Sequence, residues 1–257
     1  MTKAARPIVL LLTATVDPGA MILVKRRDPK RRFKDYKQAL RKWCRVPGFD
    51  SIIFCENSGF DLSPLRKWAA SVPKVRSRVQ FISFQGNDYP PYLGKGYGEM
   101  GILKHVFALA KFAEDTLVVK ATGRYYARNV ESLVDQIYAH AECEVFCNVD
   151  SGFKWAESVI FAGKVSFYKN YLLPLHSQIN DSADRYLEHI LADAIRAGLA
   201  SGTSWMPWSA SLELRGVSGT HDRPPRWPRQ GLARARMWML DRSFRMRRLL
   251  GLYRRPS

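Results

Sequence analysis

Cysteine and histidine are scarce in this 257-residue sequence, which holds four of the first and five of the second. Cys143 and Cys147 lie four positions apart, but no second pair or nearby histidine completes a zinc-binding set. Cys44 and Cys55 are typical of apolar fillers. We therefore expect reduced, buried thiols in a cytoplasmic protein rather than a disulfide framework.

Long apolar runs are also absent. No window approaches the roughly 20 apolar residues that span a bilayer as a helix. Lys3 and Arg6 precede the short apolar run at 8–12, as in a signal peptide, but no small-residue cleavage site follows it. We interpret this run as a buried first strand.

Acidic residues are few, with 23 against 41 basic ones, so the formal net charge is +18. The excess lies in two segments. Residues 25–45 and residues 221–257 each carry eleven basic and two acidic side chains. Two basic patches on a neutral body indicate a partner that bears phosphate, which is a nucleotide, a nucleic acid or an anionic membrane.

Short apolar runs alternate with helical patterns along most of the chain. Strands are predicted at 7–15, 51–55, 78–84, 116–120, 144–150 and 158–162, and helices at 36–45, from 63, at 99–112, 131–140 and 184–197. The alternation predicts an α/β domain with a mainly parallel, Rossmann-like sheet flanked by helices. Because the composition shifts to Arg, Pro and Trp near residue 215, we divide the chain into a domain at 1–215 and a basic tail at 216–257.

Polar residues and glycines gather where these strands end, at 13–19, 56–59, 94–99 and 120–125. Ligands of open α/β sheets bind at such strand ends. The segment GKGYGE at 94–99 precedes a helix and predicts a loop that approaches an anion closely, with a plain turn as the alternative. Lys120 and Arg124 bracket a Thr-Gly turn, where two cations can neutralise a pyrophosphate; solvated cations are the alternative.

Three segments carry a family resemblance. FCENSGFDLS at 54–63, GKGYGE at 94–99 and VVKATGRYY at 118–126 together resemble a group of bacterial glycosyltransferases with a GT-A-like fold, which assemble cell-surface polysaccharide or lipopolysaccharide. The resemblance covers roughly residues 7–200 and is most specific at KATGRY, 120–125. It implies an enzyme that moves a hexose from a nucleotide-sugar donor to a glycan or lipid-linked acceptor.

The resemblance also implies a donor site built from the strand ends. Asp17 or Glu56 would accept hydrogen bonds from ribose or base, although Asp17 also suits a turn. Arg31, Arg32 and Tyr36 would close over the phosphates from a long loop, with a solvated basic helix as the alternative. The full predicted donor set is Thr13, Asp17, Glu56, Asn57, Lys95, Gly96, Lys120, Thr122, Gly123 and Arg124.

GT-A enzymes typically hold a divalent metal with an Asp-x-Asp pair, and this sequence has no such pair. We assign no metal ligand and leave a need for Mg²⁺ or Mn²⁺ open, because Lys120 and Arg124 can replace the cation. Inverting transfer needs a carboxylate that removes the acceptor hydroxyl proton. The candidates are Asp150, Glu157, Asp184 and Glu188; we favour Glu188 and then Asp150. A retaining outcome stays open.

The Arg- and Trp-rich segment at 221–257 predicts a basic amphipathic helix over 232–252 that lies on an anionic membrane. A helix packed on the main domain and an unstructured tail are the alternatives. On the membrane interpretation, the enzyme works at the inner face of the cytoplasmic membrane.

Two other functions compete with sugar transfer. One is a nucleic-acid-binding protein, although no helix-turn-helix, zinc finger or RNA-recognition signature is present, and we expect no nucleic-acid partner. The other is a catalytically inactive glycosyltransferase-like scaffold.

Overall fold

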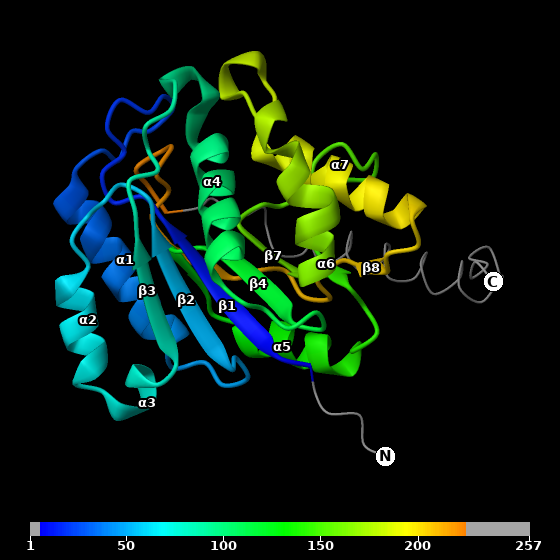
Figure 1. The fold of residues 1–257 in the computed structure, drawn as a ribbon, viewed down its shortest axis with the longest axis horizontal. Helices are drawn as coiled ribbons and strands as arrows, with labels where there is room; N and C mark the ends of the chain where they lie inside the picture. Colours follow the sequence, from blue (N-terminus) through cyan, green and yellow to red (C-terminus); the bar gives the residue numbers. More distant parts are fainter. Residues whose placement is uncertain (1–5, 225–257) are drawn as a thin grey trace.

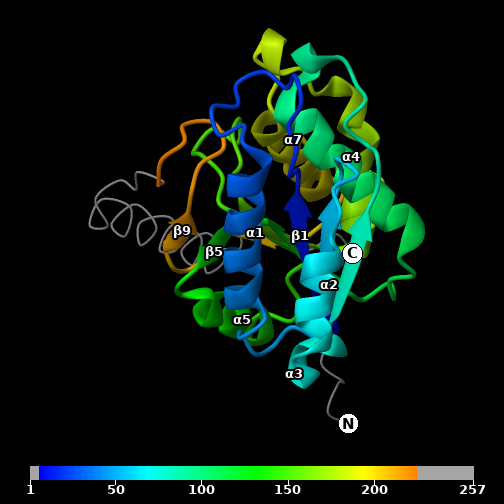
Figure 2. The same cartoon turned by 90° about the vertical axis from the view of Figure 1, so that its left-hand side faces the viewer.

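A seven-stranded sheet between two layers of helices forms the body of the protein (Figures 1 and 2). The computed structural model describes residues 6–224. In sheet order the strands are β3 (Val79–Ser83), β2 (Ser51–Glu56), β1 (Ile8–Ala14), β4 (Leu117–Thr122), β7 (Ile160–Lys164), β6 (Val145–Phe146) and β8 (Trp205–Met206). The first four are parallel, and β7 runs antiparallel to β4 and β6. The predicted α/β class with a mainly parallel sheet is confirmed.

Alternate residues of β1 enter two separate cores, which explains its unbroken apolar sequence. Leu10 and Leu12 join one cluster, whereas Val9 and Leu11 join the other. The first face is covered by α1 (Pro29–Trp43), α2 (Ser63–Ala70), α3 (Pro73–Arg76) and α5 (Val130–Ala139). The second is covered by α4 (Gly94–Leu109), α6 (Val165–Phe167) and α7 (Leu187–Ala200).

Short elements connect these layers. They are 3₁₀ turns at Pro91–Leu93, Leu173–Gln178 and Asp181–Ala183, a π-helical turn at Tyr168–Leu172, and a ribbon of β5 (Tyr125–Ala127) with β9 (Leu214–Gly216). Because β9 pairs with β5, the folded body continues past the predicted boundary at residue 215. Residues 225–257, with the predicted helix at 232–252, lie outside the described residues.

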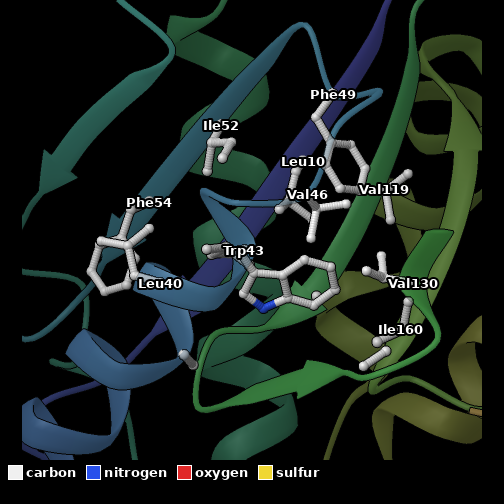
Figure 3. Packing of buried hydrophobic residues seen from close by; sticks show 14 of the residues in the cluster. Leu10, Leu40, Trp43, Val46, Phe49, Ile52, Phe54, Val119, Val130 and Ile160 are labelled. Atoms are coloured by element: carbon white, nitrogen blue, oxygen red, sulfur yellow. The ribbon is translucent and has the colours of Figure 1, made fainter. Parts of the chain in front are cut away.

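Trp43 anchors α1 to the first face of the sheet (Figure 3). Its side chain is fully buried, and its ring centroid lies 6.1 Å from that of Phe49. The indole Nε1 donates a hydrogen bond of 2.7 Å to the carbonyl of Tyr125 in β5. Trp43 therefore links a helix, the core and the ribbon that follows β4.

The first helix begins earlier than predicted, at Pro29 rather than residue 36. Asp28 caps it, because its Oδ1 accepts from the backbone N–H groups of Lys30 (2.8 Å) and Arg31 (3.3 Å). The expected long loop that carries Arg31 and Arg32 is therefore helical, and their positions are fixed by α1.

Three other predictions need correction. The expected loop at 94–99 forms the first turns of α4, and the strand at 144–150 is reduced to Val145–Phe146. The late helix begins at Leu187, while Asp184 has a left-handed conformation with φ of 53°. Asp184 and Glu188 therefore do not share a helix face. Within residues 6–224, none of the helices has the length and apolar character needed to cross a bilayer.

Replacing the Trp43 side chain tests its anchoring role. We expect Trp43→Ala to lower the free energy of unfolding by about 3–5 kcal/mol, because it empties a buried site and removes a hydrogen bond. Urea denaturation followed by circular dichroism measures this. Leu109→Ala, at a position that is 59% exposed, is the control and should change the value by less than about 0.5 kcal/mol. Equal effects of the two substitutions would contradict the prediction.

Candidate functional site

A cavity of about 130 Å³ lies where β1 and β4 end, between α1, α4 and α7. This is the edge of the sheet at which the strand ends were expected to gather. Its polar and charged wall residues are Thr13, Thr15, Arg32, Tyr36, Lys95, Glu99, Thr122, Arg124, Tyr125, Ser158, Glu188, Ser218 and Thr220. They come from segments far apart in the sequence, which the fold brings together.

Two guanidinium groups and one tyrosine form the cationic wall of the cavity. Arg124 donates to the hydroxyl of Tyr36 at 2.8 Å, and Arg32 lies 3.4 Å from the same hydroxyl. Arg32 is only 3% exposed, and this burial lowers its pKa. Within residues 6–224, its other hydrogen bonds go to backbone carbonyls, including those of Thr15 and Val16.

Neither arginine forms a salt bridge within residues 6–224. In the same range, the buried Nε of Arg124 has no hydrogen-bond partner. A buried charge that lacks a salt-bridge partner is costly, and a bound anion reduces that cost. The wall is therefore suited to an anionic ligand.

Lys120 and Glu99 form a buried ion pair beneath this wall. The Nζ of Lys120 lies 2.7 Å from Glu99 Oε1 and donates to the carbonyl of Ser158 at 2.6 Å. Glu99 Oε1 also accepts from the hydroxyls of Thr13 (2.5 Å) and Thr122 (3.1 Å). Burial opposes ionisation of Glu99, but the charge of Lys120 and these hydrogen bonds outweigh it, so its pKa is lowered.

This pair corrects the predicted role of Lys120. Its side chain is fully buried and its charge is matched by Glu99, so it does not face the cavity as a free phosphate-binding cation. Glu99 is a site residue that was not predicted from the sequence. A signal was present, however, because a lysine inside an apolar strand requires a carboxylate partner.

Glu188 is the one predicted catalytic carboxylate that lines the cavity. It lies in the first turn of α7, and its Oε1 accepts from the hydroxyl of Ser158 at 2.7 Å. The carbonyl of Ser158 accepts from Lys120, which is the ion-pair partner of Glu99. Ser158 therefore links Glu188 to the Lys120–Glu99 pair.

Asp150, predicted as the second candidate, does not line the cavity. Its Oδ1 accepts from the backbone N–H groups of Lys154 (2.7 Å) and Trp155 (3.0 Å), so it shapes a turn. Glu157 pairs with Asn148, and its burial raises its pKa. Both carboxylates have structural partners, which corrects the prediction for Asp150.

The predicted nucleotide contacts of Glu56 and Asn57 also need correction. Both side chains are fully buried and outside the cavity wall. Glu56 Oε1 accepts from the N–H groups of Val16 and Ser58, each at 2.9 Å, and Asn57 Oδ1 accepts from Thr15 at 2.7 Å. The two residues hold the ends of β1 and β2 together. Asp17 is exposed, and its carboxylate accepts from the N–H of Gly19 at 2.9 Å. Asp17 therefore forms a turn, which was the alternative to a contact with the nucleotide.

The glycines of GKGYGE serve helix packing rather than a ligand loop. A Cβ on Gly96 would lie 3.1 Å from the Cβ of Leu187, and one on Gly94 would clash with the carboxylate of Asp181. Asp181 Oδ2 accepts from the N–H of Lys95 at 3.1 Å. The negative charge at the N-terminus of α4 therefore comes from the carboxylate of Asp181, at the place where an anionic ligand was expected. Gly96 does not line the cavity, whereas the side chain of Lys95 does.

Gly123 allows the turn after β4 to approach β1. Its N–H donates to the carbonyl of Thr13 at 2.8 Å, and an added Cβ would lie 2.8 Å from that same oxygen. A side chain at this position would push β1 and β4 apart. Gly123 thus sets the spacing of the strand ends from which Thr13, Thr122 and Arg124 reach the cavity.

Residues 218–220 form one side of the cavity (orange in Figure 1). The carbonyl of Gly219 accepts from the backbone N–H groups of Lys25 (2.9 Å) and Arg26 (3.1 Å). Lys95 Nζ donates to the hydroxyl of Thr220 at 2.7 Å, and Arg26 forms a salt bridge of 2.5 Å with Asp222. The segment therefore links the loop before α1 to α4.

Metal ligands do not cluster in the part of the chain that the structure describes. Residues 6–224 contain no group of three or more His, Cys, Asp or Glu side chains placed to hold an ion. Within the cavity, Glu99 Oε1 already forms an ion pair with Lys120 and accepts hydrogen bonds from two threonines. These residues do not fit a protein-built divalent site, and we derive no step through a metal.

No protein-family model matches this chain, and no curated protein is similar to it in sequence. Solved structures with a similar layout include a mannosyltransferase from Pyrobaculum calidifontis in complex with GDP-mannose and Mn²⁺, at 11% identity and a TM-score of 0.49. That match covers 79% of this chain but 55% of the mannosyltransferase. The galactosyltransferase LgtC, in complex with donor and acceptor sugar analogues, has the same identity and score and is covered to 74%.

A third similar structure is a 4-diphosphocytidyl-2C-methyl-D-erythritol synthase, with 11% identity and a TM-score of 0.42. The match covers 91% of this chain and 99% of that enzyme. Similarity at this level does not assign an activity to the present chain.

The lowered pKa of Glu99 predicts a pH dependence of stability. A carboxyl group whose pKa is lower in the folded state contributes stability above its unfolded pKa, near 4.5, and loses it as the pH falls further. We expect the wild type to lose stability relative to Glu99→Gln/Lys120→Met as the pH falls from neutral to below about 4. Urea denaturation across this range measures it; a constant difference would contradict the ion pair.

Proposed function

We propose that this chain is a GT-A-like glycosyltransferase that binds the diphosphate of a nucleotide-sugar donor in the cavity. The observation that carries the proposal is the pair of guanidinium groups, Arg32 and Arg124, which share the Tyr36 hydroxyl without a carboxylate. Phosphate oxygens would accept from both groups and supply the missing negative charge. Lys95 adds a third cation to the cavity wall.

Glu188 is the proposed base. Lys120 and two threonines hold Glu99 as a carboxylate, so it is a poor proton acceptor. Within residues 6–224, the carboxylate of Glu188 has the Ser158 hydroxyl as its one hydrogen-bond donor and no salt bridge. In an inverting step, the acceptor hydroxyl oxygen bonds to the anomeric carbon while the bond to the donor diphosphate breaks. Glu188 takes the hydroxyl proton, and Arg32, Arg124 and Lys95 stabilise the leaving diphosphate.

A hexosyl donor and a glycan or lipid-linked acceptor of surface polysaccharide or lipopolysaccharide assembly complete the proposal. The sequence resemblance at KATGRY supports them. The mannosyl- and galactosyltransferases with a similar layout bind a sugar nucleotide or donor and acceptor analogues, in keeping with this assignment.

Substituting Arg124 tests the donor site. We expect Arg124→Ala to weaken binding of the preferred nucleotide by roughly tenfold to a hundredfold, because a charged hydrogen bond is worth about 1.5–3 kcal/mol. The exposed Arg128 supplies the matched control, Arg128→Ala, which should bind as the wild type does. Calorimetry with UDP, GDP, dTDP, CDP and CMP, with Mn²⁺ and with EDTA, measures the affinity and the need for a metal.

Three outcomes are informative. Wild-type affinity of Arg124→Ala for every nucleotide would contradict the proposed site. Nucleotide binding without sugar transfer to any acceptor would favour the inactive scaffold. No nucleotide binding together with salt-sensitive RNA binding would favour the nucleic-acid protein.

We also propose that the basic segment at 221–257 holds the enzyme on the inner face of the cytoplasmic membrane. Its eleven arginines against two aspartates support attraction to anionic lipid. Deleting 225–257 should abolish sedimentation with phosphatidylglycerol vesicles while nucleotide affinity is kept. The full chain with neutral phosphatidylcholine vesicles is the control. Unchanged sedimentation of the shortened protein would contradict the anchor.

A further inference from the structure

Three aromatic side chains cluster near Glu188, outside the cavity wall. The ring centroid of Trp155 lies 5.0 Å from that of His189 and 6.1 Å from that of Tyr186, at steep interplanar angles of 89° and 64°. Tyr186 and His189 stack at 5.6 Å with an angle of 26°. Trp155 is 42% exposed, so much of a large apolar ring faces solvent. We call these three residues the aromatic platform.

The platform is joined to the proposed base, Glu188, through the backbone. Ala156, next to Trp155, donates its N–H to the carbonyl of Glu188 at 3.1 Å. His189 directly follows Glu188 on α7. A ligand on the platform would therefore lie beside the proposed base, which itself lines the cavity.

The turn that carries Trp155 is built to hold it. Asp150 Oδ1 accepts from the N–H groups of Lys154 and Trp155, and the N–H of Asp150 donates to the carbonyl of Trp155 at 2.9 Å. Phe153 has a left-handed conformation with φ of 52°, which is unfavourable for a bulky residue. Its ring packs 5.1 Å from that of Trp205. Strain that the surrounding contacts maintain is typical of functional positions.

Hydrogen-bonding groups surround the rings. The hydroxyl of Tyr186 donates to Asp184 at 2.5 Å, and Asp184 is exposed with a left-handed φ of 53°. The backbone N–H of Tyr186 donates to Nδ1 of His189 at 3.2 Å, so a neutral His189 carries its proton on Nε2. The platform thus offers an apolar surface and one imidazole donor, and the carboxylate of Asp184 lies beside it as an acceptor.

We infer that the aromatic platform is a binding subsite for a pyranose ring of the acceptor glycan, an inference that rests on the proposed function. A pyranose has a face of C–H bonds that packs on an aromatic ring, whose face is electron-rich. It also has equatorial hydroxyl groups, which suit Asp184 and His189. The subsite places an acceptor sugar on the α7 side of Glu188, away from the cationic wall.

Saturation-transfer NMR on the full chain tests the subsite, with lactose, maltose, cellobiose and diacetylchitobiose as probes. We expect the wild type to transfer saturation to the ring protons of at least one of them. Trp155→Ala should weaken that binding by roughly three- to tenfold, since an aromatic contact is worth about 0.5–1.5 kcal/mol. Trp155→Phe should retain most of it, and Leu109→Ala, at another exposed apolar position, should have no effect.

The result is separable from that for the donor site. Trp155→Ala should keep wild-type affinity for the preferred nucleoside diphosphate, whereas Arg124→Ala should lose it and still bind the disaccharide. No transfer to any probe from the wild type, or equal transfer from Trp155→Ala, would overturn the subsite. Saccharide binding that depends on Trp155 in a protein that binds no nucleotide would uphold the subsite as a carbohydrate site and reject the glycosyltransferase.

Discussion

The ion pair between Lys120 and Glu99 holds the centre of the site together. It joins the end of β4 to α4, and Glu99 also accepts from Thr13 at the end of β1. On its other side, Lys120 donates to the carbonyl of Ser158, whose hydroxyl donates to Glu188. Removing either partner would leave a buried charge uncompensated. The positions of the strand ends and of the proposed base therefore depend on one internal interaction.

Because Lys120 is neutralised from within, the cavity has two sides of opposite character. Arg32 and Arg124 lie on the α1 side, and Glu188 lies at the start of α7. The proposed sugar transfer would use this separation, since the leaving group gains negative charge while the attacking hydroxyl loses a proton. A base placed among the arginines would be a weak one, because neighbouring positive charge lowers the pKa of a carboxyl group.

The strands β1, β2, β3, β4 and β7 and the location of the cavity were predictable, but the short strands and the direction of individual side chains were not. β1 has an apolar sequence because it is buried on both faces, and its end necessarily lies beside the end of β4. However, a carboxylate at a strand end has the same sequence signal whether it faces a ligand or a backbone N–H. Glu56 and Asp150, both predicted at strand ends, bind backbone groups, whereas the carboxylate that lines the cavity beside Glu99 is Glu188 in the first turn of α7.

The glycines of α4 show a second source of ambiguity. A glycine that permits close approach to a ligand cannot be distinguished in sequence from one that permits close approach to a neighbouring segment. Gly94 and Gly96 meet Asp181 and Leu187, which are about 90 residues away in the chain. Only the tertiary arrangement decides between these two roles.

The segment at 218–220 has a consequence for the 33 residues that follow the described body, 225–257. Since Gly219 is fixed to Lys25 and Arg26 beside the cavity, this part of the chain starts within a few residues of the site. A molecule bound near the start of this segment would stay within reach of the cavity, since a short flexible tether gives an effective concentration of about millimolar. If the tail holds the enzyme on a membrane as proposed, a lipid-linked acceptor would meet the site more often than one that diffuses freely.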